Sequence, residues 1–141
     1  MTPTHADLVA AACQVRHNSY SPYSGFRVGA ALLGASGTIY LGTNVENASF
    51  GLSNCAERTA IFRAVTDGEK RFTAIAVCSD GAAPTPPCGA CRQVLLEFGP
   101  EMVVIMAGSQ GNEGPLKTFT VSDLVPEAFI TFREDTEEGR P

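Results

Sequence analysis

Two short cysteine motifs restrict what this chain can fold into, because together they supply ligands for one metal ion. Cys55 opens the triplet Cys-Ala-Glu, and Cys88 and Cys91 form a Cys-x-x-Cys motif. A structural zinc site closes its shell with four protein ligands, whereas a catalytic site keeps three and leaves a position for water. Three thiolates beside the carboxylate of Glu57 fit the catalytic type. The fold must therefore bring two distant segments to one point.

Both motifs stand where the sequence predicts that a helix begins. One helix is expected over residues 55–65, capped by Asn54, and another over residues 88–98. At about 100° per residue, Cys55 and Glu57 would face opposite sides of a helix, so both reach one site only in front of the helix end. We therefore predict that the metal lies where two helix N-termini converge. The positive helix ends would offset part of the thiolate charge.

Two arginines adjoin these motifs. Arg58 follows Glu57 and Arg92 follows Cys91, and either guanidinium could donate hydrogen bonds to the sulfur atoms. Thiolates relieved of charge in this way let zinc lower the pKa of a bound water toward about 7. Glu57 would take the released proton as a general base and pass it to a substrate nitrogen as a general acid.

Other uses of the cysteines fit the sequence less well. A closed four-cysteine site needs a further ligand, but Cys13 lies inside a predicted helix and Cys78 ends a predicted buried strand. We expect both to be inert thiols of the core. A redox Cys-x-x-Cys would leave the Cys-Ala-Glu triplet unexplained. His5 and His17, near the two ends of the first predicted helix, resemble neither ligands nor bases.

The rest of the chain alternates helices with apolar strands. Thr4 is expected to cap the first helix. The predicted helices cover residues 4–16, 55–65 and 88–98, and the predicted strands cover residues 26–33, 38–45, 72–78, 102–107 and, at an edge, 116–120. A helical turn is expected within residues 121–129. This order implies a sheet with helices packed against it, a three-layer α/β domain.

Length and composition suit one compact domain, with 141 residues of which 44% are hydrophobic. We expect this domain to span residues 1–132, followed by a charged, mobile tail over residues 133–141. A formal charge of -5 argues against a nucleic-acid partner, since such proteins present a basic face. No stretch resembles a membrane span, and the N-terminus lacks the blocks of a secretory signal. A cytoplasmic location is expected.

Beyond the cysteine motifs, three blocks resemble the small zinc-dependent cytidine deaminases. Cys-Ala-Glu with Pro-Cys-x-x-Cys is the signature of zinc-dependent nucleoside and nucleobase deaminases. Residues 20–30 resemble the N-terminal block of the cytidine deaminases, residues 42–49 their ribose-binding block and residues 124–129 their C-terminal block. The resemblance implies an α/β/α domain with a central mixed sheet. It also implies hydrolytic deamination of cytidine and deoxycytidine to uridine and deoxyuridine, with release of ammonia, in pyrimidine salvage.

The same resemblance implies roles for individual residues. The three cysteines would hold one zinc ion per subunit, and Glu57 would carry the proton. Asn44 and Glu46 would hold the ribose, and their alternation on an extended segment places both on one face. Phe26 would pack against the pyrimidine ring, and the backbone of Ala56 would contact the base.

Small deaminases with cysteine as the first zinc ligand tend to be homotetramers, in which neighbouring subunits complete each pocket. The matching positions here are Ala48, Phe50 and Phe129. Phe50 departs from the tyrosine that is frequent in the family. We therefore expect a homotetramer acting on a small nucleoside.

Two other functions stay open on the sequence. The chain could deaminate another small aminopyrimidine nucleoside, or it could be a non-catalytic zinc-binding module. An enzyme that edits polynucleotides fits the acidic composition less well.

Overall fold

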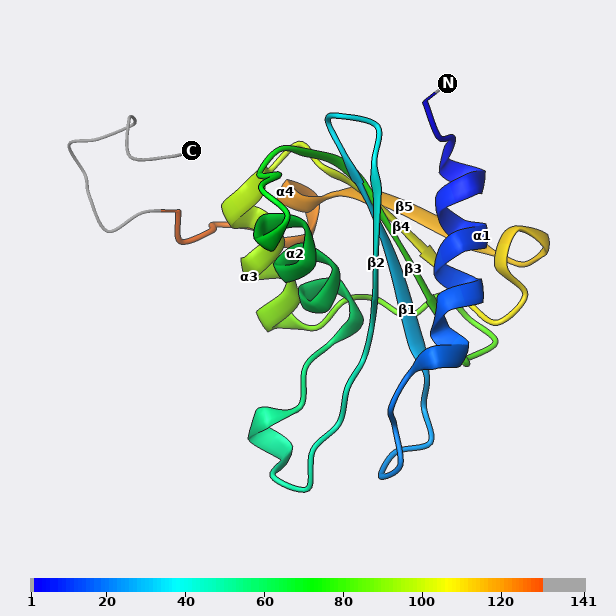
Figure 1. Cartoon of the computed structure of the whole chain (residues 1–141). Coiled ribbons are helices and arrows are strands. Elements are labelled where there is room, and N and C mark those ends of the chain that lie inside the picture. Colours follow the sequence, from blue (N-terminus) through cyan, green and yellow to red (C-terminus); the bar gives the residue numbers. More distant parts are fainter. Residues whose placement is uncertain (1, 131–141) are drawn as a thin grey trace.

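The structure is a computed structural model that describes residues 2–130, and Figure 1 shows helices on both faces of one sheet. The first helix, α1 (His5–Val15), covers one face. The opposite face carries α2 (Ala56–Thr66), α3 (Gly89–Phe98) and the short α4 (Val121–Leu124). The predicted three-layer α/β/α arrangement is confirmed.

Five strands form the sheet in the order β2-β1-β3-β4-β5. Their bounds are β1 (Val28–Gly34), β2 (Ile39–Thr43), β3 (Phe72–Ser79), β4 (Val103–Ala107) and β5 (Leu116–Thr120). β3 and β4 run parallel, and the other neighbouring pairs run antiparallel. The expected central mixed sheet is therefore present, and each strand lies within two residues of its predicted bounds.

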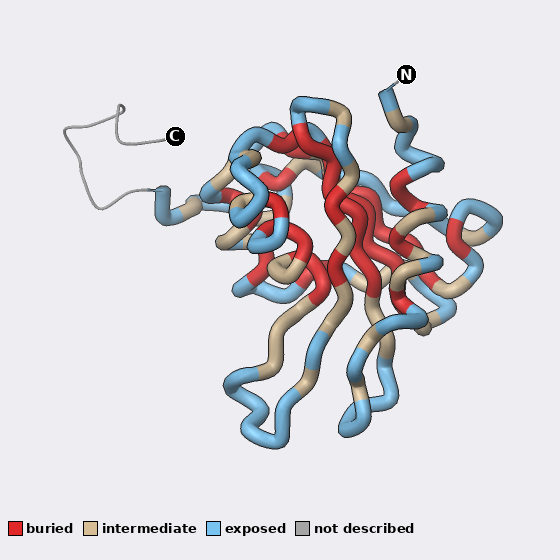
Figure 2. The backbone as a smooth tube through the Cα atoms, viewed as in Figure 1, coloured by how far each residue is buried: buried red, intermediate tan, exposed pale blue. Residues whose placement is uncertain are grey.

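Alternation along the strands divides the interior into two cores. In β1, Ala30 and Leu32 pack toward α2 and α3, whereas Ala31 and Leu33 pack toward α1. The buried residues run through the middle of the molecule between the two helical layers (Figure 2). Because both faces are covered, β3 is buried from Ala74 to its end, as expected for a central strand.

The helix starts follow the predicted capping pattern in one case and depart from it in another. Thr4 caps α1 in a reciprocal capping box with Asp7. The cap of α2 is Cys55 and not Asn54, so the helix begins one residue later than expected. Asn54 instead forms an isolated bridge with Val45. The shift matters because it places a sulfur atom at the helix end.

The prediction that Cys13 and Cys78 are inert thiols is wrong, because their sulfur atoms form a disulfide. Their Cα atoms lie 5.1 Å apart, within the usual range for such a bond. Burial of Cys78 on the face of β3 covered by α1 is what brings the two side chains together. The disulfide therefore joins the outer helix to the central strand.

Two expectations concern the ends and the surroundings of the chain. The charged tail predicted over residues 133–141 lies outside the described residues and stays a prediction. Among the helices that the structure describes, none is long and apolar enough to cross a bilayer.

Candidate active site

Three sulfur atoms meet where α2 and α3 begin. Cys55 is the N-cap of α2, Cys88 is the N-cap of α3, and Cys91 lies buried in the first turn of α3. Their Sγ atoms all lie within 4.8 Å of one another, and those of Cys55 and Cys88 are 3.7 Å apart. The structure therefore gathers the two cysteine motifs at the helix ends.

This cluster fits zinc. Two thiolates bound to one zinc ion at about 2.3 Å, with tetrahedral angles, lie about 3.8 Å apart. The 3.7 Å between the Sγ atoms of Cys55 and Cys88 matches that value. Three soft sulfur donors are also the ligand type that zinc accepts readily. The residues present can therefore hold the ion through three ligands, and Cys13 and Cys78 are not among them.

Glu57 lies in the first turn of α2 beside these sulfur atoms. Its side chain is only 4% exposed, although it carries a carboxyl group. Burial raises the pKa of Glu57 to about 7, and the nearby Cys55 acts in the same direction. Glu57 also lines a hollow of the surface together with Cys55 and Cys88. A buried carboxyl group facing a cavity is suited to exchange protons with a bound molecule.

The two arginines take different positions. Nη2 of Arg58 donates to Sγ of Cys55 at 3.3 Å. Hydrogen bonding from Cys91 and from Arg58 lowers the pKa of Cys55, which favours its thiolate. Arg92, the other candidate donor to sulfur, binds backbone carbonyl groups instead. Nε of Arg92 donates to the carbonyl of Pro87, and Nη1 donates to the carbonyl of Leu124 in α4.

A cavity of about 260 Å³ opens beside the cysteine cluster. Besides Glu57 and two cysteines, its walls include Asn44, Glu46 and Ala56. A second hollow of about 370 Å³ shares Glu46 and Ser53 with it and extends toward Tyr23 and Phe50. The residues predicted to bind ribose therefore face the same space as the cysteine cluster.

Asn44 and Glu46 also organise the loops around the cavity. The side chain of Asn44 donates to the carbonyl of Phe26 and accepts from the N–H of Val28, each at 2.9 Å. The carboxylate of Glu46 accepts from the N–H groups of Tyr23 and Ser24 at 3.0 and 3.1 Å. The Ser24 hydroxyl also donates to this carboxylate, and its hydrogen bond is the largest cause of a lowered pKa of Glu46. The two backbone N–H groups lower this pKa further. The pocket wall is thus held by residues that face the cavity.

Four other predicted contact residues lie outside the walls of this cavity. Phe26 is 37% exposed beside it, and Ala48 is exposed on the segment that projects from the body of the molecule (Figure 1). Phe50 lies on the same segment and is 74% exposed, in edge contact with Tyr23. Phe129 is 57% exposed beyond α4, where Gln93 donates to its carbonyl.

Sequence reasoning missed six residues that line the cavity, which are Val28, Ser53, Asn54, Val77, Thr85 and Pro86. Thr85 and Pro86 line it from the proline-rich loop before Cys88. Their position directly before the Cys-x-x-Cys motif was the available signal, because a loop that ends at a ligand must pass beside the site.

Comparisons with known proteins agree with this geometry. A sequence profile of the cytidine and deoxycytidylate deaminase zinc-binding region matches residues 2–107. A cytidine deaminase of Halalkalibacterium halodurans is 49% identical over 122 residues, which cover 86% of this chain and 91% of that protein. A cytidine deaminase of Sporosarcina psychrophila is 48% identical over 123 residues, which cover 86% of this chain and 88% of that protein.

Solved structures show the same fold. The crystal structure of a cytidine deaminase from Burkholderia pseudomallei superposes with a TM-score of 0.85 at 46% identity, covering 90% of this chain and all of that one. A cytidine deaminase from Mycobacterium tuberculosis gives 0.74 at 37% identity, covering 86% of this chain and 94% of that one. With the cysteine cluster, the buried Glu57 and these likenesses together, the chain belongs to the cytidine and deoxycytidylate deaminase family.

Proposed function

We propose that this protein is a zinc-dependent deaminase that converts cytidine and deoxycytidine to uridine and deoxyuridine with release of ammonia. The observation that carries the proposal is the buried carboxyl group of Glu57 beside three converging sulfur atoms, in a cavity that also presents Asn44 and Glu46. One zinc ion per subunit would be held by Cys55, Cys88 and Cys91. When bound, zinc supplies Lewis-acid activation of water at neutral pH.

Glu57 moves the protons of the reaction. Water adds to C4 of the cytosine ring, and the amino group on that carbon leaves as ammonia. Glu57 accepts a proton as the water adds and delivers it to the ring nitrogen. It then takes the proton of the new hydroxyl group on C4 and delivers it to the leaving amine, so that the C4 carbonyl forms as ammonia departs. Its burial supports this role, because a carboxyl group with a pKa near neutrality can both accept and donate a proton.

The remaining residues support the cysteine cluster and orient the nucleoside. Arg58 donates to Cys55 and so reduces the charge that three sulfurs would place on the ion. Arg92 holds the loop before Cys88 through the carbonyl of Pro87. Asn44 and Glu46 bind the ribose, while Phe26 and the backbone of Ala56 contact the base. A ribose clamp favours nucleosides over the free base.

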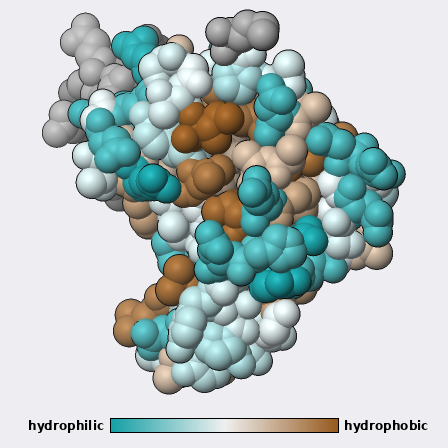
Figure 3. Space-filling model, turned by 45° about the vertical axis from the view of Figure 1, so that its right-hand side comes forward, coloured by the Kyte–Doolittle hydropathy of each residue, from teal (hydrophilic) through white to brown (hydrophobic). Residues whose placement is uncertain are grey.

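Assembly into a homotetramer is part of the proposal. Ala48, Phe50 and Phe129 are exposed and lie outside the cavity of their own chain, which supports their use in a neighbouring pocket. Hydrophobic side chains gather on the projecting part of the surface (Figure 3), where Phe50 and Leu52 are 74% and 72% exposed. Exposed apolar patches of this kind are typical of interfaces between subunits.

The proposed location is the cytoplasm. Three unpaired cysteines that must stay reduced to bind a metal favour a reducing compartment. The disulfide between Cys13 and Cys78 favours an oxidising compartment instead. Blocking free thiols at the moment of cell lysis, followed by mass analysis of residues 13 and 78, decides between them.

A substrate panel tests the proposed activity. Purified protein is incubated with cytidine, deoxycytidine, cytosine and a single-stranded oligonucleotide, with absorbance and ammonia followed together and zinc counted per subunit. We expect turnover of both nucleosides with equal release of ammonia, and little turnover of cytosine or of the oligonucleotide. Protein that contains zinc and turns over none of the four would leave the non-catalytic module as the better explanation.

A further inference from the structure

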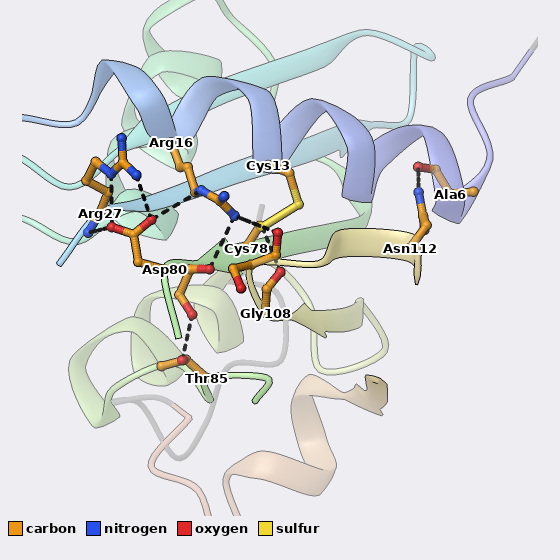
Figure 4. The surroundings of a disulfide bond; sticks show 11 residues. Ala6, Cys13, Arg16, Arg27, Cys78, Asp80, Thr85, Gly108 and Asn112 are labelled. Carbon is orange, nitrogen blue, oxygen red and sulfur yellow. Dashed lines mark hydrogen bonds and ion pairs between the residues drawn. A yellow bond between two sulfur atoms is a disulfide. The ribbon is translucent and has the colours of Figure 1, made fainter. Parts of the chain in front are cut away.

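The carboxylate of Asp80 contacts two arginines from different segments of the chain, Arg16 and Arg27 (Figure 4). Its Oδ2 accepts from the backbone N–H of Arg27 and from Nε of the same arginine, each at 2.9 Å. Its Oδ1 lies 3.2 Å from Nη2 of Arg27 and 3.3 Å from Nε of Arg16. The backbone N–H of Asp80 donates in return to the carbonyl of Arg27 at 3.1 Å. Asp80 thus holds the chain before β1 against the end of β3.

The segment that Asp80 holds forms a wall of the cavity. Arg27 stands between Phe26, which is proposed to contact the base, and Val28, which lines the cavity. From the cavity side, Asn44 binds the carbonyl of Phe26 and the N–H of Val28. Residues 26–28 are therefore fixed from one side by Asn44 and from the other by Asp80.

Alternation along β3 explains why the carboxylate acts from outside the cavity. Val77 lines the cavity, and the hydroxyl of Ser79 lies 2.7 Å from that of Thr85, which lines it too. Cys78 lies between them and packs on the face covered by α1, and Asp80, directly after β3, pairs with Arg16 at the C-terminal cap of α1. The last residues of β3 therefore belong to the cavity on one face and to this charged cluster on the other.

Arg16 fixes the orientation of Asp80. Its side chain is buried, and Nη1 donates to Sγ of Cys78 at 3.0 Å and to the carbonyl of Ser79 at 3.3 Å. A buried guanidinium needs a nearby anion, and Asp80 supplies one. The hydrogen bond from Arg27 also lowers the pKa of Asp80, so its carboxylate is ionised at neutral pH.

We propose that Asp80 is a positioning residue for the nucleoside pocket, which fixes residues 26–28 through the backbone N–H of Arg27. The inference rests on the proposed deaminase function. Asp80 is not proposed to touch substrate, so its removal should weaken nucleoside binding more than it slows the chemical step.

Three variants separate this role from a general loss of stability. Asp80→Ala removes the acceptor of the Arg27 N–H and should raise KM for cytidine about 10-fold, with kcat changed less than about 3-fold and zinc content unchanged. Asp80→Asn keeps a neutral acceptor and should raise KM less. Arg27→Met is the matched control, because it removes both side-chain hydrogen bonds to Asp80 and leaves the backbone one. Its KM should stay within about 2-fold of the original protein.

Amide exchange gives a readout that needs no catalysis. In the nucleoside-free protein, the amides of residues 26–28 should exchange at least about 10-fold faster in Asp80→Ala than in Arg27→Met. If the unaltered protein deaminates no cytidine, the proposed function fails while this exchange experiment still tests the role of Asp80.

Either of two results would overturn the inference. One is an Asp80→Ala protein with lowered thermal stability and unchanged KM and exchange. The other is an Arg27→Met protein that changes KM and exchange as much as Asp80→Ala does. If Asp80→Ala fails to fold, Asp80→Asn carries both measurements, and values equal to those of the original protein would count against the role.

Discussion

The sulfur atoms of Cys55 and Cys88 lie 3.7 Å apart although the two residues cap different helices. Each is an N-cap with extended backbone, so its side chain lies at the end of a helix instead of along its flank. Two helices that start at the same edge of the sheet can therefore bring their first residues to one ion. The cluster of three sulfur atoms is a consequence of how α2 and α3 pack.

Removal of one ligand should abolish zinc binding while leaving the fold in place. For Cys88→Ser we expect zinc content to fall to about a tenth or less of its original value, because a site with two remaining thiolates binds weakly. Metal analysis after extensive dialysis measures this, with circular dichroism as a check of folding. The matched control is the double variant Cys13→Ser/Cys78→Ser, which should keep its zinc. Full zinc retention in Cys88→Ser would contradict the ligand assignment.

The disulfide predicts how many thiols react. In denaturant with a chelator and no reductant, a thiol reagent should modify the three free cysteines, Cys55, Cys88 and Cys91. After reduction it should modify all five. Counting the mass increments of the intact chain gives the answer directly. Five modified cysteines before reduction would show that Cys13 and Cys78 are not bonded.

Gly42 should be intolerant of even a methyl group. A Cβ at this position of β2 would overlap the backbone of Ala56 and Ala60, so α2 would have to move outward. Because α2 begins with Cys55 and carries Glu57, we expect Gly42→Ala to lose about 1–3 kcal/mol of unfolding free energy and to lose activity with it. Gly51→Ala is the control, since nothing lies within 4 Å of its added Cβ. Equal stability and activity of the two variants would refute the close contact between β2 and α2.

Asp80 should contribute to stability in a way that depends on pH. The hydrogen bond from Arg27 lowers the pKa of Asp80 in the folded protein. A carboxyl group with a lowered folded pKa stabilises the fold above its unfolded value, about 3.9, and that contribution is lost as the pH falls through the folded value. The unfolding free energy, measured with urea between about pH 6 and pH 3, should therefore decrease less on acidification in Asp80→Asn than in the original protein.

The same measurement has an internal check. Arg27→Met removes the main cause of the lowered pKa, so its unfolding free energy should also depend less on acid than that of the original protein. If the unfolding free energies of all three proteins change in parallel with pH, then Asp80 and Arg27 do not set the pH dependence of stability.

The proposed sharing of pockets between subunits predicts complementation. Phe129→Ala and Glu57→Ala proteins should each be nearly inactive, the first because it spoils a neighbouring pocket and the second because it lacks the proton carrier. Mixed tetramers would contain some pockets with both residues intact, so activity should return after the two are unfolded and refolded together. Activity that stays at the level of the separate variants would show that each chain builds its pocket alone.

Much of the fold was readable because local patterns and long-range packing agree. The continuous apolar runs of β1 and β3 are typical of strands covered on both faces. Thr4 and Asp7 form their capping box from local sequence alone. The cap of α2 was misplaced because Asn54 is the better capping residue by chemistry, yet its backbone is used in a bridge with Val45.

The parts that escaped prediction depend on contacts between distant residues. The residues around Cys13 do not indicate that Cys78 is its disulfide partner. The pairing depends on the packing of α1 against β3. The contrast between Arg58 and Arg92 is of the same kind. Both follow a site residue, but α4 offers Arg92 a carbonyl acceptor that the sequence does not reveal.

The most direct test of the account is Glu57→Gln, assayed for cytidine turnover and metal content in the same preparation. Glutamine keeps the size of the side chain and cannot carry the proton. The account predicts full zinc content with kcat reduced about 100-fold or more. A Glu57→Gln protein that deaminates cytidine at the original rate, or one that has lost its zinc, would contradict the role assigned to this residue.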